Sequence, residues 1–202
     1  MTHDHGSPIL NAVYAAETAD EQRSAYDAWA NDYDRDIFQY GIRIPAMAAA
    51  LFARHIAPDE GPILDAGCGT GLQAEPLALL GFGPITGIDL SEGMLAAAQA
   101  KNIYASLSTA TLGEPLDFAN GAFANTYCIG ALTPGHAPAS SFDELIRVTS
   151  PGGRLIVSLR ADTGEDYQAA LDDHISTGRI AAEHTTSAFA SMPLADITIL
   201  HR

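Results

Sequence analysis

The chain has 202 residues, and 47% of them are hydrophobic, which excludes a wholly disordered protein and fits one domain. Ten Lys and Arg residues stand against 25 Asp and Glu residues, so the formal net charge is −15, and Lys101 is the one lysine. Nucleic acid and anionic membranes both require a basic face, which nine arginines scattered along the sequence do not provide. We therefore expect neither nucleic acid nor a membrane among the partners.

Cysteine and histidine usage points away from disulfides and metal. The two cysteines, Cys68 and Cys128, cannot form a disulfide framework, and no Cys or His pair has the spacing of metal ligands. The N-terminal segment lacks the basic and apolar regions of a signal peptide, and no apolar run reaches the ~18 residues of a membrane span. These features predict a cytoplasmic protein without a metal site.

The N-terminal quarter is expected to form a helical cap. The first 18 residues are polar and interrupted by Gly and Pro, so we expect little order at the start. Helical periodicity follows up to about residue 34, with one stripe formed by Tyr26, Trp29, Ala30 and Tyr33. Pro45 can open a second helix, and a break follows at 58–61. We expect residues 1–58 to be a cap or lid, and residues 59–202 to be the core of one structural domain.

Short apolar strands then alternate with helices. Strands are expected at about 62–66, 85–90, 105–112, 123–130 and 154–159. Helices are expected up to residue 80 and over 91–101, 141–149 and 165–177, with Ser91 as an N-cap and a Ser-x-x-Glu capping box at Ser141 and Glu144. Two last strands, about 179–189 and 195–201, are joined by a link too short for a crossover helix, so they should be antiparallel.

This order of elements predicts an α/β fold. The expected architecture is a doubly wound, Rossmann-like, seven-stranded sheet with five parallel strands and a C-terminal antiparallel hairpin. Ligands of such sheets bind beyond the carboxyl ends of the strands.

A glycine-rich turn stands at that place. In ILDAGCGTG, a strand leads into Gly67, Gly69 and Gly71, which lack the Cβ atoms that would hold a ligand away from the backbone. Leu72 occupies the position of the third Gly of the dinucleotide fingerprint, which argues against an oxidoreductase. No Lys-Ser/Thr pair follows, so the turn is not a P-loop. A tight connection without any ligand is the alternative interpretation.

Asp89 adds a second polar feature at the same edge. It ends the next strand, in ITGIDLS, where a carboxylate can accept hydrogen bonds from the two hydroxyls of a ribose. The alternative is that it only favours the N-terminus of the helix after Ser91.

Three segments resemble class I S-adenosylmethionine-dependent methyltransferases in order and spacing: ILDAGCGTG, ITGIDLSEGML and LIRVTSPGGRLIVS. YDAWANDYDRD, TLGEPL and IGAL extend the similarity to the small methyltransferase-like proteins of the vertebrate Williams-syndrome region. The resemblance runs from about Tyr26 to Leu159. It implies S-adenosylmethionine as cofactor and S-adenosylhomocysteine as product.

The resemblance also implies which residues bind the cofactor. Asp65 and Gly67 would hold its aminocarboxypropyl end, and Asp89 its ribose diol. Thr111 stands where many relatives have an Asp at the adenine, so this contact departs from the family pattern. The implied set is Tyr26, Tyr33, Asp65, Gly67, Cys68, Gly69, Gly71, Asp89, Leu90, Met94, Thr111, Leu112, Ile129 and Gly130.

The expected function is methyl transfer to a small neutral or cationic acceptor, selected by the N-terminal segment and residues 131–140. His136, Tyr33 and Tyr40 are candidate catalytic residues, against the alternatives of an exposed loop histidine and packing aromatics. IGALTPG replaces an NPPY-type sequence, so DNA-adenine and protein-glutamine methylation are not expected. A cofactor-binding regulatory or scaffolding module without turnover is the other hypothesis, and monomer and homodimer both remain open.

Overall fold

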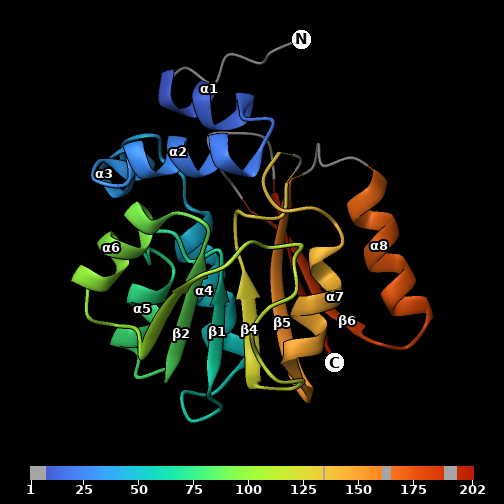
Figure 1. Ribbon diagram of the computed structural model, residues 1–202. Coiled ribbons are helices and arrows are strands. Elements are labelled where there is room, and N and C mark those ends of the chain that lie inside the picture. The colour runs from blue at the N-terminus through green and yellow to red at the C-terminus, as the bar shows by residue number, and fades with distance from the viewer. Residues whose placement is uncertain (1–7, 134, 161–164, 189–194) are drawn as a thin grey trace.

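The computed structural model describes residues 8–133, 135–160, 165–188 and 195–202. A seven-stranded sheet forms its centre, in the order β3-β2-β1-β4-β5-β7-β6 (Figure 1). In chain order the strands are β1 (Ile63–Ala66), β2 (Ile85–Asp89), β3 (Ser106–Thr109), β4 (Phe123–Cys128), β5 (Thr149–Arg160), β6 (Ala181–Ala188) and β7 (Ala195–His201). Strands β1 to β5 pair in parallel, and β7 is antiparallel to both β5 and β6. The predicted architecture is confirmed.

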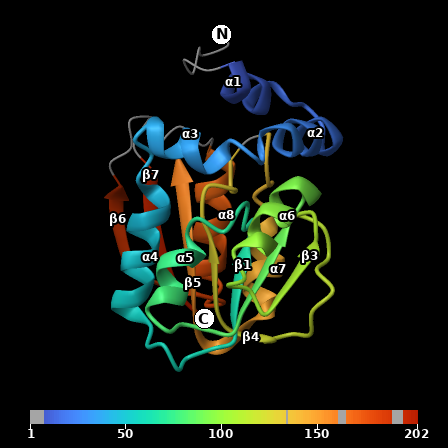
Figure 2. The same cartoon turned by 90° about the vertical axis from the view of Figure 1, so that its left-hand side faces the viewer.

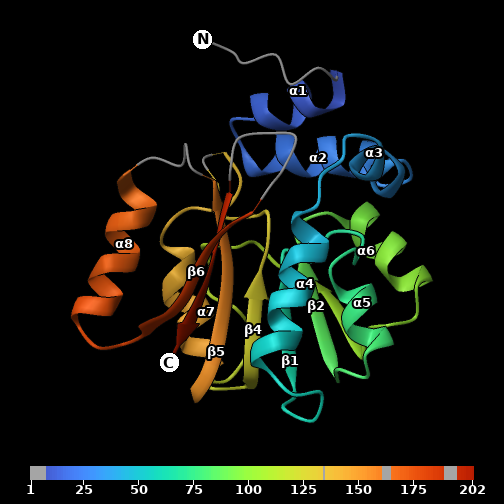
Figure 3. The same ribbon diagram turned by 180° about the vertical axis from the view of Figure 1, so that it is seen from behind.

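Helices cover both faces of the sheet. Successive residues of β1 point to opposite faces, so Ile63 packs with the helices α4 (Ile44–His55) and α5 (Ala74–Leu79). Leu64 packs on the other face with α7 (Ser141–Val148) and α8 (Glu165–Ser176). Figure 3 shows α4 and α5 from behind, and α6 (Glu92–Ala100) packs on β2 and β3. No described helix combines the length and the hydrophobicity needed to cross a membrane.

Three N-terminal helices lie across the end of the sheet to which the strands point (Figure 2). They are α1 (Pro8–Ala15), α2 (Ala19–Trp29) and α3 (Tyr33–Gln39). Helix α1 was not predicted, and its Leu10 and Val13 are buried against Trp29, whereas the very start of the chain, where little order was expected, lies outside the described residues. Trp29 is only 3% exposed and donates its indole N–H to Asp36 over 2.9 Å, so it is a packing residue of these helices.

The predicted capping box was wrong. Ser141 is the first residue of α7, and the residue before it, Ser140, makes no side-chain capping bond. Glu144 is held instead by the Arg147 guanidinium, with contacts of 2.6 and 2.7 Å, and by the backbone N–H of Leu116. A carboxylate held by a charged donor on the next turn is not available to the N-terminus of its helix.

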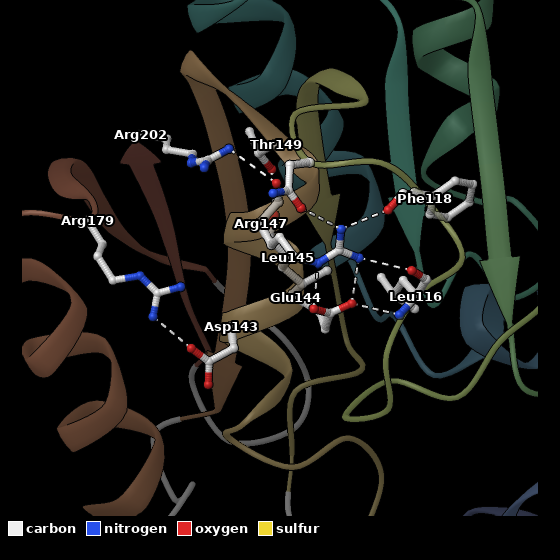
Figure 4. A network of polar contacts seen from close by, with 10 residues as sticks. Leu116, Phe118, Asp143, Glu144, Leu145, Arg147, Thr149, Arg179 and Arg202 are labelled. Carbon is white, nitrogen blue, oxygen red and sulfur yellow. Dashed lines mark hydrogen bonds and ion pairs between the residues drawn. The ribbon is translucent and has the colours of Figure 1, made fainter.

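Arg147 joins α7 to the segment before β4 (Figure 4). Besides Glu144, its guanidinium donates to the carbonyls of Phe118 and Leu116 over 2.7 and 2.9 Å and to the side chain of Asn120. The Arg147 carbonyl accepts from Arg202, which ties the C-terminal end of the chain to the same place. One side chain therefore holds together α7 and the connection that leads into β4.

Candidate functional site

A cavity lies between the N-terminal helices and the carboxyl end of the sheet. Its floor comes from the turn after β1, the ends of β2 and β4, and the segment after β3. Its roof comes from α2, from Tyr33 and from the loop around His136. The lining residues include Tyr26, Tyr33, Gly67, Gly69, Asp89, Leu90, Met94, Thr111, Leu112, Ile129, Gly130 and His136. The sheet topology therefore creates a site where this fold class carries its ligands.

The glycine turn forms the floor with its backbone. Gly67 has φ +73°, and a Cβ there would come within 2.8 Å of the Ala131 side chain. The backbone N–H groups of Gly67 and Cys68 both donate to the Ile88 carbonyl, at 2.8 and 2.9 Å, which fixes the turn to β2. Glycine is required because a side chain would force Ala131 out of the cavity wall.

Asp89 presents a carboxylate to this floor. Its Oδ2 accepts the backbone N–H of Gly69 over 2.8 Å, and its Oδ1 accepts that of Ser91 over 2.9 Å. Burial raises the pKa of Asp89, and these backbone hydrogen bonds oppose the rise. Each carboxylate oxygen retains a lone pair for one more donor, so the side chain can bind a pair of neighbouring hydroxyls.

The roof contains an aromatic cluster with one polar pair. The Tyr26 hydroxyl and His136 Nε2 are 2.9 Å apart, which joins α2 to the loop after β4. The Tyr33 ring lies 6.4 Å from that of Tyr26, centroid to centroid. Gln22, one turn before Tyr26, donates its amide to the Gly135 carbonyl over 3.1 Å and holds the same loop. Burial raises the pKa of both tyrosines, so their hydroxyls stay protonated at neutral pH.

Two carboxylates of the N-terminal helices, Asp27 and Asp34, hold the roof of the cavity to the core. Asp27 Oδ1 accepts the Ser91 hydroxyl over 2.6 Å and the Gly93 backbone N–H over 2.8 Å, at the start of α6. Asp34 pairs with Lys101 Nζ at 2.7 Å and accepts the Thr70 hydroxyl of the glycine turn. Residues of the N-terminal helices are thus fixed to α6 and to the glycine turn.

The cavity gathers most, not all, of the residues expected from the sequence. Asp65, Cys68, Gly71 and Tyr40 do not line it. The Cys68 thiol is 1% exposed, and burial raises its pKa, so it is not a reactive thiol. Tyr40 packs near Trp29 and Ile37 in the cap. Asp65 points to the face of the sheet that carries α5, because it alternates with Leu64 and Ala66 along β1.

Sequence reasoning missed several lining residues. Gln22 was detectable, since it lies four residues before Tyr26 and so on the same side of α2. Ala19 and Ala110 carried no chemical signal, and Ala131 and Ala137 were expected only as part of the segment 131–140.

The cavity's chemistry fits an adenosine carrying a sulfonium side chain, as the resemblance implies. Asp89 suits a ribose diol, Leu90, Met94 and Leu112 offer apolar surface for a base, and the Cβ-free turn allows close approach. The aromatic rings of Tyr26 and Tyr33, which line the cavity, suit a cationic sulfur. The residues present therefore fit S-adenosylmethionine.

The sequence is similar to known methyltransferases. Residues 64–157 match a family described as a methyltransferase domain. The human Methyltransferase-like protein 27 is 40% identical over 151 residues, which are 73% of this chain and 61% of that protein. An N,N-dimethyltransferase of dTDP-3-amino-3,6-dideoxy-alpha-D-glucopyranose from Streptomyces fradiae is 33% identical over 121 residues, 60% of this chain and 42% of that protein. The chain spans less than two thirds of either curated relative.

Solved structures share the fold. The magnesium protoporphyrin IX methyltransferase of Synechocystis PCC 6803, solved with bound S-adenosylhomocysteine, has a TM-score of 0.72 at 19% identity. That match covers 89% of this chain and 97% of that one. A TehB-like methyltransferase from Corynebacterium glutamicum has a TM-score of 0.67 at 18% identity, over 89% of this chain and 98% of that one. The matched domain, the relatives and the shared fold together support a class I S-adenosylmethionine-dependent methyltransferase.

Proposed function

We propose that this chain transfers a methyl group from S-adenosylmethionine to a small-molecule acceptor. The observation that carries the proposal is one continuous cavity, with Asp89 and the glycine turn on its floor and the Tyr26–His136 pair in its roof. Asp89 and the backbone around Gly67 and Gly69 would hold the cofactor, and Tyr33 would lie near its sulfur. When bound, the cofactor supplies a methyl group on a positive sulfur, which leaves as a neutral thioether when a nucleophile takes the methyl group.

Tyr26 and His136 would handle the acceptor's proton. The Tyr26 hydroxyl can donate to His136 Nε2, since they are 2.9 Å apart and the hydroxyl is protonated at neutral pH. As the acceptor is methylated, its proton passes to the Tyr26 oxygen and the Tyr26 proton passes to His136. Positioning supplies the rest of the catalysis, and Gln22 contributes by fixing the loop that carries His136.

The cavity's charge favours an uncharged or cationic acceptor. No described residue that lines the cavity is a lysine or arginine, so the cavity offers an anionic acceptor no cationic side chain to pair with. The net charge of −15 repels polyanions as well. The acceptors that we propose are small molecules with a hydroxyl or an amine group. We place the reaction in the cytoplasm. The roof helices and the loop around His136 would select among them.

Calorimetric titration with S-adenosylmethionine, S-adenosylhomocysteine and NADH, followed by turnover with a panel of phenols and amines, tests the proposal. We expect micromolar binding of both adenosyl compounds, none of NADH, and methylation of at least one uncharged or cationic acceptor. His136→Asn should lower kcat by about 10²–10⁴-fold with cofactor affinity unchanged. His201→Asn, exposed on β7, is the matched control.

Absence of adenosyl binding would refute the proposal. Adenosyl binding without turnover on any acceptor would instead favour the regulatory or scaffolding module.

A further inference from the structure

A buried carboxyl group lies directly beneath the glycine turn, on the side away from the cavity. Asp65 is fully buried, although it is the third residue of the four-residue strand β1 and stands only two residues before Gly67. Its Oδ2 accepts the Tyr104 hydroxyl over 2.6 Å, and its Oδ1 accepts the Gln73 amide over 3.2 Å. Both partners come from outside the turn, since Tyr104 precedes β3 and Gln73 stands at the start of α5.

These partners also touch the turn itself. The Gln73 amide donates to the Cys68 carbonyl over 3.4 Å, and that carbonyl also accepts the Gly71 N–H. The Tyr104 ring fills the space beside Gly71, where a Cβ would come within 3.0 Å of it. It also lies against Gly87 of β2, where a Cβ would come within 2.9 Å. Tyr104 therefore fits against two glycines and fixes the underside of the turn.

The other side of the glycine turn faces the cavity, and its position affects a cavity residue there. The Gly69 N–H donates to Asp89 Oδ2, so the position of the turn sets the orientation of the carboxylate that faces the ribose site. A chain of contacts thus runs from Tyr104 through Asp65 and Gln73 to the turn, and from the turn to Asp89.

We propose that Tyr104 is a positioning residue, which acts through Asp65 and Gln73 to hold the glycine turn and Asp89 in their cofactor-binding arrangement. The inference rests on the proposed function, because it assumes that the cavity binds the cofactor. It gives Asp65 a role different from the one that the family resemblance implies. Asp65 supports the turn from below and does not contact the cofactor's amino group.

The electrostatics of Asp65 agree with this role. Burial raises the pKa of Asp65 to about 7, while the hydroxyls of Tyr104 and Tyr127 and the Gln73 amide oppose the rise. Asp89 raises it further, and Cys68 is the other titratable group at this place. A carboxyl group that is partly protonated at neutral pH is a weak partner for an ammonium group but a good centre for hydrogen bonds.

Two ligands separate the two roles of Asp65. S-adenosylhomocysteine carries the amino-acid group, whereas 5′-methylthioadenosine has the same adenosine and thioether without it. We expect Tyr104→Phe to keep the ring packing, lose the hydrogen bond and weaken both ligands by the same factor, about tenfold. Asp65→Asn should also weaken both, and the double variant should be no weaker than the more affected single variant, because the two residues act as one unit.

The control is Thr149→Val, which removes buried hydrogen bonds of 2.8 and 2.7 Å at the opposite end of the sheet. Thr149→Val should lower the free energy of unfolding but leave the dissociation constants of both ligands within about twofold of the wild type. This result would show that loss of stability alone does not weaken binding. If Tyr104→Phe does not fold, Gln73→Met tests the same network from its other donor.

The inference fails if Tyr104→Phe and Gln73→Met leave both affinities unchanged, or if Asp65→Asn weakens S-adenosylhomocysteine alone. A wild-type protein that binds neither ligand would refute the proposed function itself, so the two failures are distinguishable.

Discussion

Asp89 fixes the glycine turn, and we propose that the same side chain binds the ribose of the cofactor. It fixes the tip of the glycine turn through Gly69, and it faces the cavity with the lone pairs that a ribose diol needs. Asp89→Ala should weaken S-adenosylhomocysteine by about 10²-fold, because two charge-assisted hydrogen bonds are lost. Asp89→Asn keeps one acceptor oxygen and should weaken the binding of S-adenosylhomocysteine less. Calorimetric titration measures both, and unchanged affinity in the alanine variant would contradict the assignment of the ribose site.

Asp65 should make folding stability depend on pH. Its pKa is about 7 in the folded protein and close to 4 when unfolded, so the folded state holds the proton more tightly between these values. The contribution of Asp65 is fully present below the unfolded pKa and is lost as pH rises toward 7. Urea unfolding at several pH values should show wild type losing stability relative to Asp65→Asn between about pH 4 and 7, with a flat difference above about pH 8.

Carboxylates with lowered pKa values act in the opposite direction. Arg147 lowers the pKa of Glu144, and Arg154 lowers that of Glu183. Their contributions are present above the unfolded pKa and are lost in acid, in both the wild type and Asp65→Asn. The difference between the two proteins therefore isolates Asp65, and a difference that does not vary with pH would contradict the raised pKa.

Among the elements, the junction of α2 with α6 joins the roof of the cavity to its floor. Asp27 satisfies the Gly93 N–H at the start of α6, while the Ser91 hydroxyl satisfies that of Met94. Asp27→Ala leaves an N-terminal donor without its partner and removes a negative charge from the helix N-terminus, a loss of about 1–2 kcal/mol. Because Met94 lines the cavity, S-adenosylhomocysteine should bind about tenfold more weakly.

The matched control on the same helix is Asp20→Ala. Asp20 pairs with Arg23 on the exposed side of α2, and its side chain is 82% exposed. Titration should show unchanged affinity for this variant. Equal weakening by both variants would show that loss of charge, and not the junction with α6, is responsible.

Arg147 determines how firmly α7 is attached to the segment before β4. Lysine at this position retains the charge, but it cannot reproduce the planar fork that binds the Glu144 carboxylate and two carbonyls at once. Arg147→Lys should cost about 2 kcal/mol of the free energy of unfolding, measured by chemical denaturation. The control is Arg23→Lys on the exposed side of α2, which should change the free energy of unfolding by less than about 0.5 kcal/mol. Equal losses in the two variants would contradict the role of the guanidinium fork.

The elements differ in how well the sequence predicts them. Periodicity and turn residues predicted the sheet and its hairpin, because strand burial follows a local pattern. Helix α1 was not predicted, since Leu10 and Val13 are buried in a cluster with residues more distant in the sequence, such as Trp29 and Ile37. The capping box failed for a similar reason, because Arg147 is a stronger partner for Glu144 than the helix terminus.

The site shows the same division between local and distant contacts. The glycine turn and Asp89 lie in a recognisable local pattern, and the structure places them at the cavity. The support for Asp65 comes from Tyr104, 39 residues away, and no spacing rule relates them. Residues that act through long-range contacts are therefore found only in the folded arrangement.

For the whole molecule, the charge imbalance is the dominant electrostatic feature. With a net charge of −15, the compact state repels itself more than the unfolded chain does. Its ion pairs are largely at the surface, such as Lys101 with Asp34 and Glu75, whose acidic side chains are 40% and 44% exposed. Such pairs contribute little to stability, so their loss in salt is a small effect.

Salt should therefore stabilise this protein. Raising NaCl from 20 mM to 0.5 M shortens the Debye length from about 20 Å to about 4 Å and screens the repulsion between distant carboxylates. For each kcal/mol of repulsion removed, Tm should rise by about 2–4 °C in a chain of this length. Calorimetric melting at constant pH measures the shift, with KCl as a check that ionic strength and not sodium is responsible. A fall in Tm with salt would mean that the surface ion pairs outweigh the net repulsion.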